Sequence, residues 1–161
     1  MRPVWIKGNQ VDLLESGQEF FPSLLNEIEN AQTEIILFTY IFKNDRIGTE
    51  VGKRLKSAAL RNVAVTLVID GFGSGNLPVN FIEDLRNSKV QILVFRAFHR
   101  IFSLRKLFFR RLHQKIVVID QKIAFVGGIN IDGDQYEQLD YALRVSGPVV
   151  IKIYKFAKLL I

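Results

Sequence analysis

Residues 113–130 read His-Gln-Lys-Ile-Val-Val-Ile-Asp-Gln-Lys-Ile-Ala-Phe-Val-Gly-Gly-Ile-Asn, two short apolar runs separated by three polar residues. The runs 116–119 and 123–126 have the length and β-branched content of strands, and the polar residues between them form a tight connection. Because side chains alternate between the faces of a strand, His113 and Lys115 point the same way if the first strand extends back to them.

The polar residues of this stretch suit chemistry at a phosphate. The His113 imidazole can attack phosphorus, and the Lys115 ammonium can neutralise charge on the equatorial oxygens. Gly127 and Gly128 remove side chains where substrate or backbone comes close, and Asn130 offers an amide donor to a phosphate oxygen. Each residue alone is more often structural, but we estimate a chance match to all six positions of H-x-K-x4-D-x6-G-G-x-N at roughly 10⁻⁶.

Around this stretch, apolar strands and amphipathic helices alternate along the chain. The pattern predicts an α/β fold, an α/β/α sandwich with a mixed, largely parallel sheet, in a single domain over residues 1–161. A Gly-rich loop at 70–76 follows a buried strand, where open α/β sheets tend to bind ligands, although a plain connection is the commoner role. The predicted strands are 11–14, 33–42, 63–69, 90–95, 116–119, 123–126 and 141–145, and the predicted helices are 16–30, one capped by Asp45, 79–87 and one that begins at Pro148.

Composition narrows the class of protein. The chain is 48% hydrophobic and 24% charged, as globular domains are. It has no cysteine, which excludes disulfides and thiol chemistry. The absence of cysteine and the presence of only two histidines together argue against a structural zinc site. No apolar run approaches the ~18 residues of a membrane-spanning helix. If a membrane is involved, this segment is expected to lie on it, peripherally.

Charge is distributed unevenly along the chain. Residues 1–84 carry 8 Lys and Arg against 11 Asp and Glu, whereas residues 85–161 carry 14 against 5. Such asymmetry indicates an anionic partner for the C-terminal side. Residues 96–112 interleave basic and large apolar side chains, and three interpretations stay open. The favoured one is a membrane-surface segment whose cations, Arg110 and Arg111 among them, meet anionic headgroups. The others are nucleic-acid binding and a helix with a solvated basic face.

The stretch 113–130 resembles the HKD signature of the phospholipase D superfamily. Residues 34–42 and 63–74 resemble the early strands of that family, and residues 140–148 resemble the strand that follows its motif. The Gly-Gly-Ile-Asn variant makes the chain most similar to the N-terminal half of a bacterial cardiolipin synthase. One departure is Gln114, where those synthases often carry Arg, at a position that tolerates change.

The resemblance implies a mechanism and a set of roles. His113 is the nucleophile or the acid/base, Lys115 and Asn130 hold phosphate, and Asp140 orients and polarises His113. No metal or organic cofactor is needed, because lysines and asparagines handle the charge. Asp120 is typical of the family but is expected to be structural at the hairpin. The substrate-binding candidates are Gly127, Gly128, Arg110 and Arg111.

The family mechanism uses two H-x-K motifs that face each other, and this sequence has one. The expected partners are therefore an anionic phospholipid surface and a second HKD half, supplied by a C-terminal half or by a second copy. We expect the first half of a phosphatidyltransferase or phosphodiesterase, truncated after residue 161 and placed at the cytoplasmic face of the cell membrane. A homodimeric HKD nuclease acting on nucleic acid is the alternative, and a non-catalytic binding module is a third class.

Overall fold

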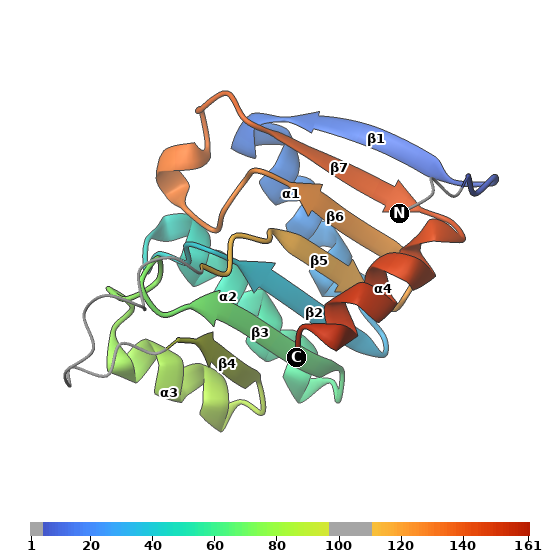
Figure 1. The fold of residues 1–161 in the computed structure, drawn as a ribbon. Helices are drawn as coiled ribbons and strands as arrows, with labels where there is room; N and C mark the ends of the chain where they lie inside the picture. The colour runs from blue at the N-terminus through green and yellow to red at the C-terminus, as the bar shows by residue number, and fades with distance from the viewer. Residues whose placement is uncertain (1–4, 97–110) are drawn as a thin grey trace.

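The chain forms one sheet with helices on both faces in a computed structural model that describes residues 5–96 and 111–161 (Figure 1). The sheet has seven strands in the order β1-β7-β6-β5-β2-β3-β4. The strands are β1 (Gln10–Glu15), β2 (Glu34–Thr39), β3 (Ala64–Asp70), β4 (Gln91–Phe95), β5 (Ile116–Ile119), β6 (Ile123–Gly127) and β7 (Tyr141–Ser146). The helices are α1 (Ser16–Asn30), α2 (Arg46–Leu60), α3 (Val79–Asn87), the 3₁₀ turn η1 (Gly133–Gln135) and α4 (Val149–Leu159).

The sheet is mixed, but it is not largely parallel, and the prediction was wrong on that point. Only the β2–β3 and β3–β4 pairs are parallel, whereas the β2–β5, β5–β6, β6–β7 and β1–β7 pairs are antiparallel. Parallel neighbours need a long crossover, and α2 and α3 provide one for each parallel pair. The short hairpin between β5 and β6 makes its two strands antiparallel.

The predicted three layers are confirmed. Helices α1, α2 and α3 cover one face of the sheet and α4 covers the other (Figure 1). Successive side chains of β2 point to opposite faces of the sheet, so the strand contributes to both cores. Ile35 and Leu37 pack with the first three helices, and Ile36 and Phe38 pack on the α4 side. This burial on both faces explains why β2 reads as an unbroken apolar run.

Asp120 joins the β5–β6 hairpin to the start of β2. Asp120 and Gln121 both have positive φ, 53° and 56°, as in the type I′ turns that suit two-residue hairpins. The Asp120 carboxylate accepts hydrogen bonds from the backbone N–H groups of Gln32 (2.9 Å), Thr33 (2.7 Å) and Glu34 (3.0 Å). It lies at the opposite end of β5 from Lys115, so its place in the fold fits a structural role.

Replacing Asp120 with Ala is expected to destabilise the fold by about 3 kcal/mol, through lost charge-assisted hydrogen bonds and strain in the left-handed region. Burial opposes the charged form of Asp120, but the N–H groups of Glu34, Gln32 and Thr33 outweigh it and lower the pKa. The stabilisation is therefore full above the unfolded pKa of about 4 and is lost as pH falls through the lower folded pKa. Urea unfolding at pH 7 and pH 3 measures both effects. Equal stability of the two proteins at pH 7 would contradict this role.

Candidate active site

His113 and Lys115 meet at the end of the sheet where β5 begins. The Lys115 Nζ lies 3.1 Å from Nε2 and 3.3 Å from Nδ1 of His113, and it donates to the His113 carbonyl oxygen at 3.2 Å. Both residues precede Ile116, the first residue of β5, so the strand does not extend back to them, yet their side chains meet. His113 is exposed, so a phosphodiester at this end of the sheet can reach the imidazole and the ammonium together.

Lys115 is partly withdrawn from water. Burial lowers the pKa of its ammonium, and the negative charge of Asp140 opposes that shift. A partly desolvated cation interacts with an approaching phosphate more strongly than a fully solvated one, because less water screens the interaction. The environment of Lys115 therefore suits charge neutralisation at phosphorus.

Asp140 lies against the glycine pair. Among the described residues, no hydrogen bond or ion pair joins its carboxylate to His113, and its Oδ1 accepts from the Tyr141 N–H at 2.7 Å. A Cβ at Gly128 would collide with both carboxylate oxygens of Asp140, and a Cβ at Gly127 would collide with the Tyr141 carbonyl oxygen. The two glycines are thus needed for β7 and the Asp140 carboxylate to approach this closely.

Replacing Gly128 with Ala is expected to displace the Asp140 carboxylate. Overpacking of this kind typically costs about 1–3 kcal/mol, and a misplaced charge near the reacting groups can cost about 10²-fold in turnover. Thermal unfolding and steady-state kinetics on the same preparation separate the two effects. A variant with unchanged turnover would show that the position of Asp140 does not matter to the chemistry.

Asn130 follows β6 and is almost fully buried, with 6% of its surface exposed. Its Oδ1 accepts from the backbone N–H of Ile41 at 3.0 Å and from the Thr39 hydroxyl at 3.5 Å. Because the oxygen of the amide is engaged by β2 and the residues after it, the NH₂ group is the part of Asn130 that can serve a phosphate oxygen.

Tyr40 belongs to the site although no motif marks it. Its ring centroid lies 5.2 Å from that of His113, and the Lys115 Nζ lies 5.6 Å from the centroid of the Tyr40 ring. A cation over an aromatic face is stabilised by the ring quadrupole. The signal available in the sequence is that Tyr40 lies in the stretch 34–42, which resembles an early strand of the phospholipase D superfamily, and directly follows the buried strand β2.

A comparison with protein families decides what this arrangement is. The family described as the PLD-like domain of cardiolipin synthase matches residues 24–156, which include Tyr40, His113, Lys115, Asn130 and Asp140. The chain belongs to the phospholipase D superfamily. The HKD reading of residues 113–130 is thereby confirmed.

Curated relatives of this phospholipase D superfamily member include cardiolipin synthases. Cardiolipin synthase B of Salmonella typhi is 42% identical to it over 97% of the chain, and that of Escherichia coli K12 is 37% identical over the same share. In both alignments the match covers 39% of the relative. The chain therefore spans about two fifths of the length of these relatives.

Solved structures with the same fold include chains of similar size. NucT from Helicobacter pylori superposes with a TM-score of 0.77 at 18% identity, and 94% of each chain is covered. A phospholipase D family member, Nuc from Salmonella typhimurium, has a TM-score of 0.71 at 19% identity, with 94% of this chain and 93% of Nuc covered. At such identities the likeness shows the fold alone.

Of the two predicted substrate-binding arginines, Arg111 lies within the described residues and Arg110 does not. Residues 97–110, with Arg110 and most of the predicted membrane-binding segment, lie outside the described residues. The Arg111 guanidinium carbon lies 4.1 Å from the ring centroid of Phe72, in the loop after β3, so Arg111 contacts that loop two residues before His113.

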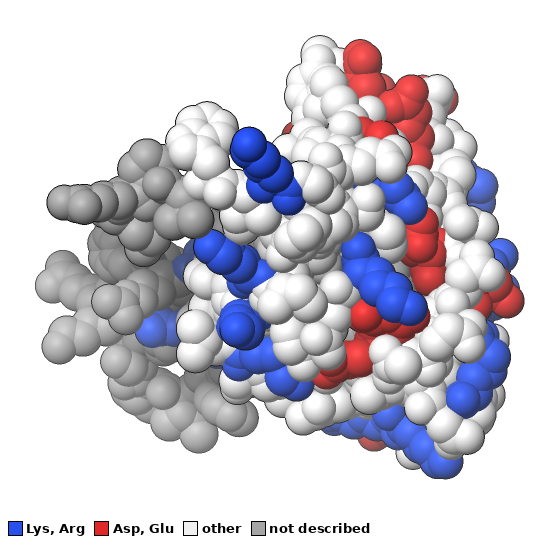
Figure 2. All heavy atoms as spheres, turned by 90° about the vertical axis from the view of Figure 1, so that its right-hand side faces the viewer, with Lys and Arg blue, Asp and Glu red and all other residues white. Residues whose placement is uncertain are grey.

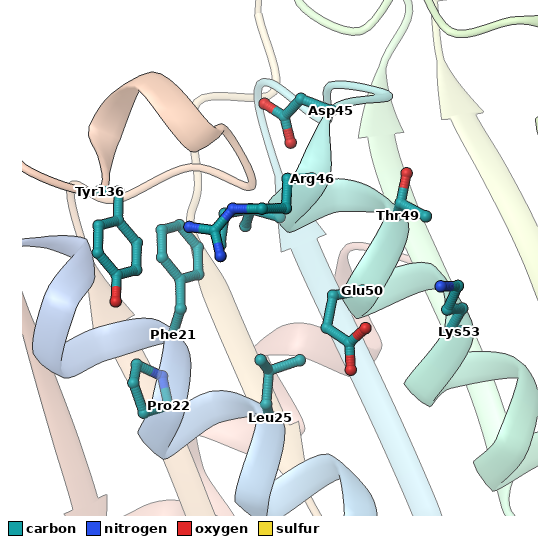
Figure 3. A pocket seen from close by; sticks show the side chains of 10 residues that line it. Phe21, Pro22, Leu25, Asp45, Arg46, Thr49, Glu50, Lys53 and Tyr136 are labelled. Carbon is teal, nitrogen blue, oxygen red and sulfur yellow. The ribbon is translucent and has the colours of Figure 1, made fainter.

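A separate pocket of about 440 Å³ lies between α1 and α2 and contains none of the HKD residues (Figure 3). Phe21 and Tyr136 lie on one side of it, and the Arg46 guanidinium carbon lies 5.4 Å from the Tyr136 ring centroid. Within residues 5–96 and 111–161, no three His, Asp or Glu side chains are grouped as metal ligands would be.

Proposed function

We propose that the chain is one catalytic half of a cardiolipin-synthase-like phosphatidyltransferase or phosphodiesterase that acts on phosphatidylglycerol-type headgroups. The contact between His113 and Lys115 carries this proposal, because it brings a nucleophile and a phosphate-neutralising cation to one point in a chain that resembles cardiolipin synthases along its length. The identities of 37–42% to cardiolipin synthase B favour a lipid substrate over nucleic acid.

In the proposed reaction, the His113 imidazole attacks phosphorus and a nitrogen–phosphorus bond forms as the bond to the leaving alkoxide breaks. A second histidine, from the other half, protonates that alkoxide. It then takes the proton of an acceptor hydroxyl, whose oxygen attacks phosphorus and releases His113. Lys115 and Asn130 hold the phosphate oxygens through both steps. Water as acceptor gives hydrolysis, and the hydroxyl of a second phosphatidylglycerol gives transfer.

The role of Asp140 is proposed to include His113 as well as Lys115. Asp140 supports the charged form of Lys115, and it lies beside the glycine pair at the same end of the sheet. The Gly127 N–H donates to the Lys115 carbonyl oxygen at 3.3 Å, which ties the strand of the motif to the glycines. Closure of the second half over this end is expected to bring the carboxylate onto the imidazole, where it would polarise His113.

An exposed apolar strip supports the need for a second half. On the α4 face of the sheet, Val11 pairs with Val145 and Leu13 pairs with Leu143 across β1 and β7. Val11, Leu13 and Leu143 are 55%, 60% and 39% exposed, and Tyr141, which continues the strip toward Asp140, is 46% exposed. A contiguous apolar surface of this kind is typical of a protein–protein contact.

An anionic membrane surface is the proposed second partner, with the chain lying peripherally on its cytoplasmic face. No helix among the described residues has both the length and the apolar character to cross a bilayer. On the face drawn in Figure 2, Lys and Arg side chains lie on both sides of a band of Asp and Glu. Exposed Lys152 and Lys155 on α4 add positive charge that anionic headgroups attract.

The test joins the chain to its second HKD half and supplies vesicles of phosphatidylglycerol. The expected products are cardiolipin and glycerol, detected by mass spectrometry, with no cleavage of a single-stranded oligonucleotide. The alternative is a homodimeric HKD nuclease. It is favoured by the observation that NucT and Nuc are matched over 94% and 93% of their own chains, so a chain of this size can be a whole chain with this fold. Cleavage of the oligonucleotide by the chain alone, without lipid turnover, would replace the proposed function with that alternative.

A further inference from the structure

A buried carboxylate lies behind the HKD residues and has no part in the reaction described above. Asp70 ends β3 and only 1% of its surface is exposed. Burying a charged group is costly unless its hydrogen bonds are satisfied, so such a residue calls for an explanation. The Asp70 Oδ1 accepts from the N–H groups of Phe72 (2.9 Å) and Gly73 (3.0 Å), and its Oδ2 accepts from the N–H of Leu112 (3.0 Å).

One of these hydrogen bonds fixes the main chain at the nucleophile. Leu112 directly precedes His113, and its side chain is 5% exposed in the core on the α4 side. The Oδ2 of Asp70 therefore joins the end of β3 to the residue from which the His113 backbone continues. With Leu112 held by both its side chain and its N–H, the direction in which His113 leaves the core is determined.

The other hydrogen bonds reach the His113 ring through Tyr40. Oδ1 of Asp70 holds Gly73, and a Cβ on Gly73 would collide with the Tyr40 carbonyl oxygen and with its ring. The Ser74 hydroxyl donates to the same carbonyl at 3.1 Å. Tyr40 is thus packed closely on the loop that Asp70 organises, and its ring faces the imidazole at 5.2 Å.

We propose that Asp70 is a positioning residue, which fixes His113 from two sides, through the main chain at Leu112 and through the ring of Tyr40. The inference rests on the proposed role of His113 as nucleophile. In this proposal the loop after β3 holds the imidazole in place and does not contact the substrate. An imidazole held in one direction attacks phosphorus without first losing side-chain freedom, so the benefit is expected in the chemical step.

The first test is kinetic and uses the chain joined to its second half on phosphatidylglycerol vesicles. Asp70→Asn keeps the size of the side chain but replaces one of its two accepting oxygens with an NH₂ group. The N–H groups of Phe72, Gly73 and Leu112 then share a single acceptor. We expect kcat to fall about 10²-fold with little change in KM, because a displacement near 1 Å is enough for such a loss. Tyr40→Leu tests the second route without touching a buried charge and is expected to lower kcat, while Tyr40→Phe restores it.

A matched control separates positioning from loss of stability. Ile28 is fully buried near the C-terminal end of α1. That end lies beside Asp120, at the opposite end of β5 from His113. Ile28→Ala is expected to lower the melting temperature while leaving kcat unchanged when the assay is run well below that temperature. A fall in kcat for Ile28→Ala equal to that for Asp70→Asn would overturn the proposal.

The second test needs no turnover and uses the chain by itself. The chain has two histidines, so His99→Gln identifies the His113 ring signals in NMR spectra. We expect a nuclear Overhauser effect between the Tyr40 and His113 rings that is lost in Asp70→Asn and kept in Ile28→Ala. If this pattern holds while the complete protein turns over no phospholipid, the proposed function fails and the positioning stands. If the effect survives in Asp70→Asn, the positioning fails whatever the activity.

Discussion

Replacing His113 with Asn is expected to lower phospholipid turnover by about 10⁴-fold or more, as loss of a nucleophile does in other covalent mechanisms. Asn is smaller and polar, and its amide nitrogen is not nucleophilic, because its lone pair is delocalised into the carbonyl. Because His113 is exposed, the folded structure should be kept, with an unchanged circular dichroism spectrum and melting temperature. The measurement is the rate of cardiolipin formation by the chain joined to its second half.

A trapping experiment tests the same prediction by a route that does not depend on rate. Brief reaction with phospholipid labelled at phosphorus, followed by alkaline quench, should leave label on the wild-type chain as acid-labile phosphohistidine. His113→Asn should carry none. Labelled His113→Asn, or turnover within tenfold of wild type, would remove His113 from the role of nucleophile.

Replacing Lys115 with Met is expected to lower turnover by about 10²–10⁴-fold, because charge on the phosphate oxygens then develops without a cation nearby. Lys122 offers a matched control, since it is an exposed lysine at the other end of the β5–β6 hairpin. Lys122→Met removes the same charge from the chain and should leave turnover unchanged. Equal losses in the two variants would indicate that overall charge matters, and not the contact with His113.

The pH dependence of turnover follows from the environment of Lys115. Burial lowers the pKa of Lys115, so activity that needs its ammonium should be lost at a pH below the ordinary value of about 10.4. The Asp140 charge raises that pKa, so Asp140→Asn should move the basic limb of the pH–rate profile to still lower pH. If the basic limb of the pH–rate profile has the same pKa in Asp140→Asn as in the wild type, titration of Lys115 does not determine that limb.

The hairpin that carries the motif could be predicted from sequence because its signals are local. Two β-branched runs of four or five residues and a polar connection determine β5 and β6, and both strands have the predicted start. The spacing of His113 and Lys115 predicted that their side chains point the same way if the strand extends back to them. In the structure β5 begins at Ile116, and the two side chains meet without that extension. The three layers followed from the alternation of apolar strands with amphipathic helices, which have few other ways to bury their faces.

The misses concern pairing at long range. The sequence does not say that β5 lies beside β2, so the direction of that pair could not be predicted, and the sheet was expected to be largely parallel. The partners of Tyr40 and Asp70 were hidden for the same reason. Tyr40 meets His113 and Asp70 binds the N–H of Leu112 only after β2, β3 and β5 have assembled. Neither contact leaves a spacing to recognise.

The strand order has a consequence for how this molecule folds. β5 is inserted between β2, made much earlier in the chain, and β6, made just after it, and β1 pairs only with β7 near the other end. The long chain segments between these strands must lose conformational entropy before the strands can pair. Folding should therefore be slow for the size of the domain. On a ribosome, β1 has no strand partner until β7 emerges. The edge of the sheet therefore stays open through most of synthesis, a period in which chaperones or a membrane surface can engage the nascent chain.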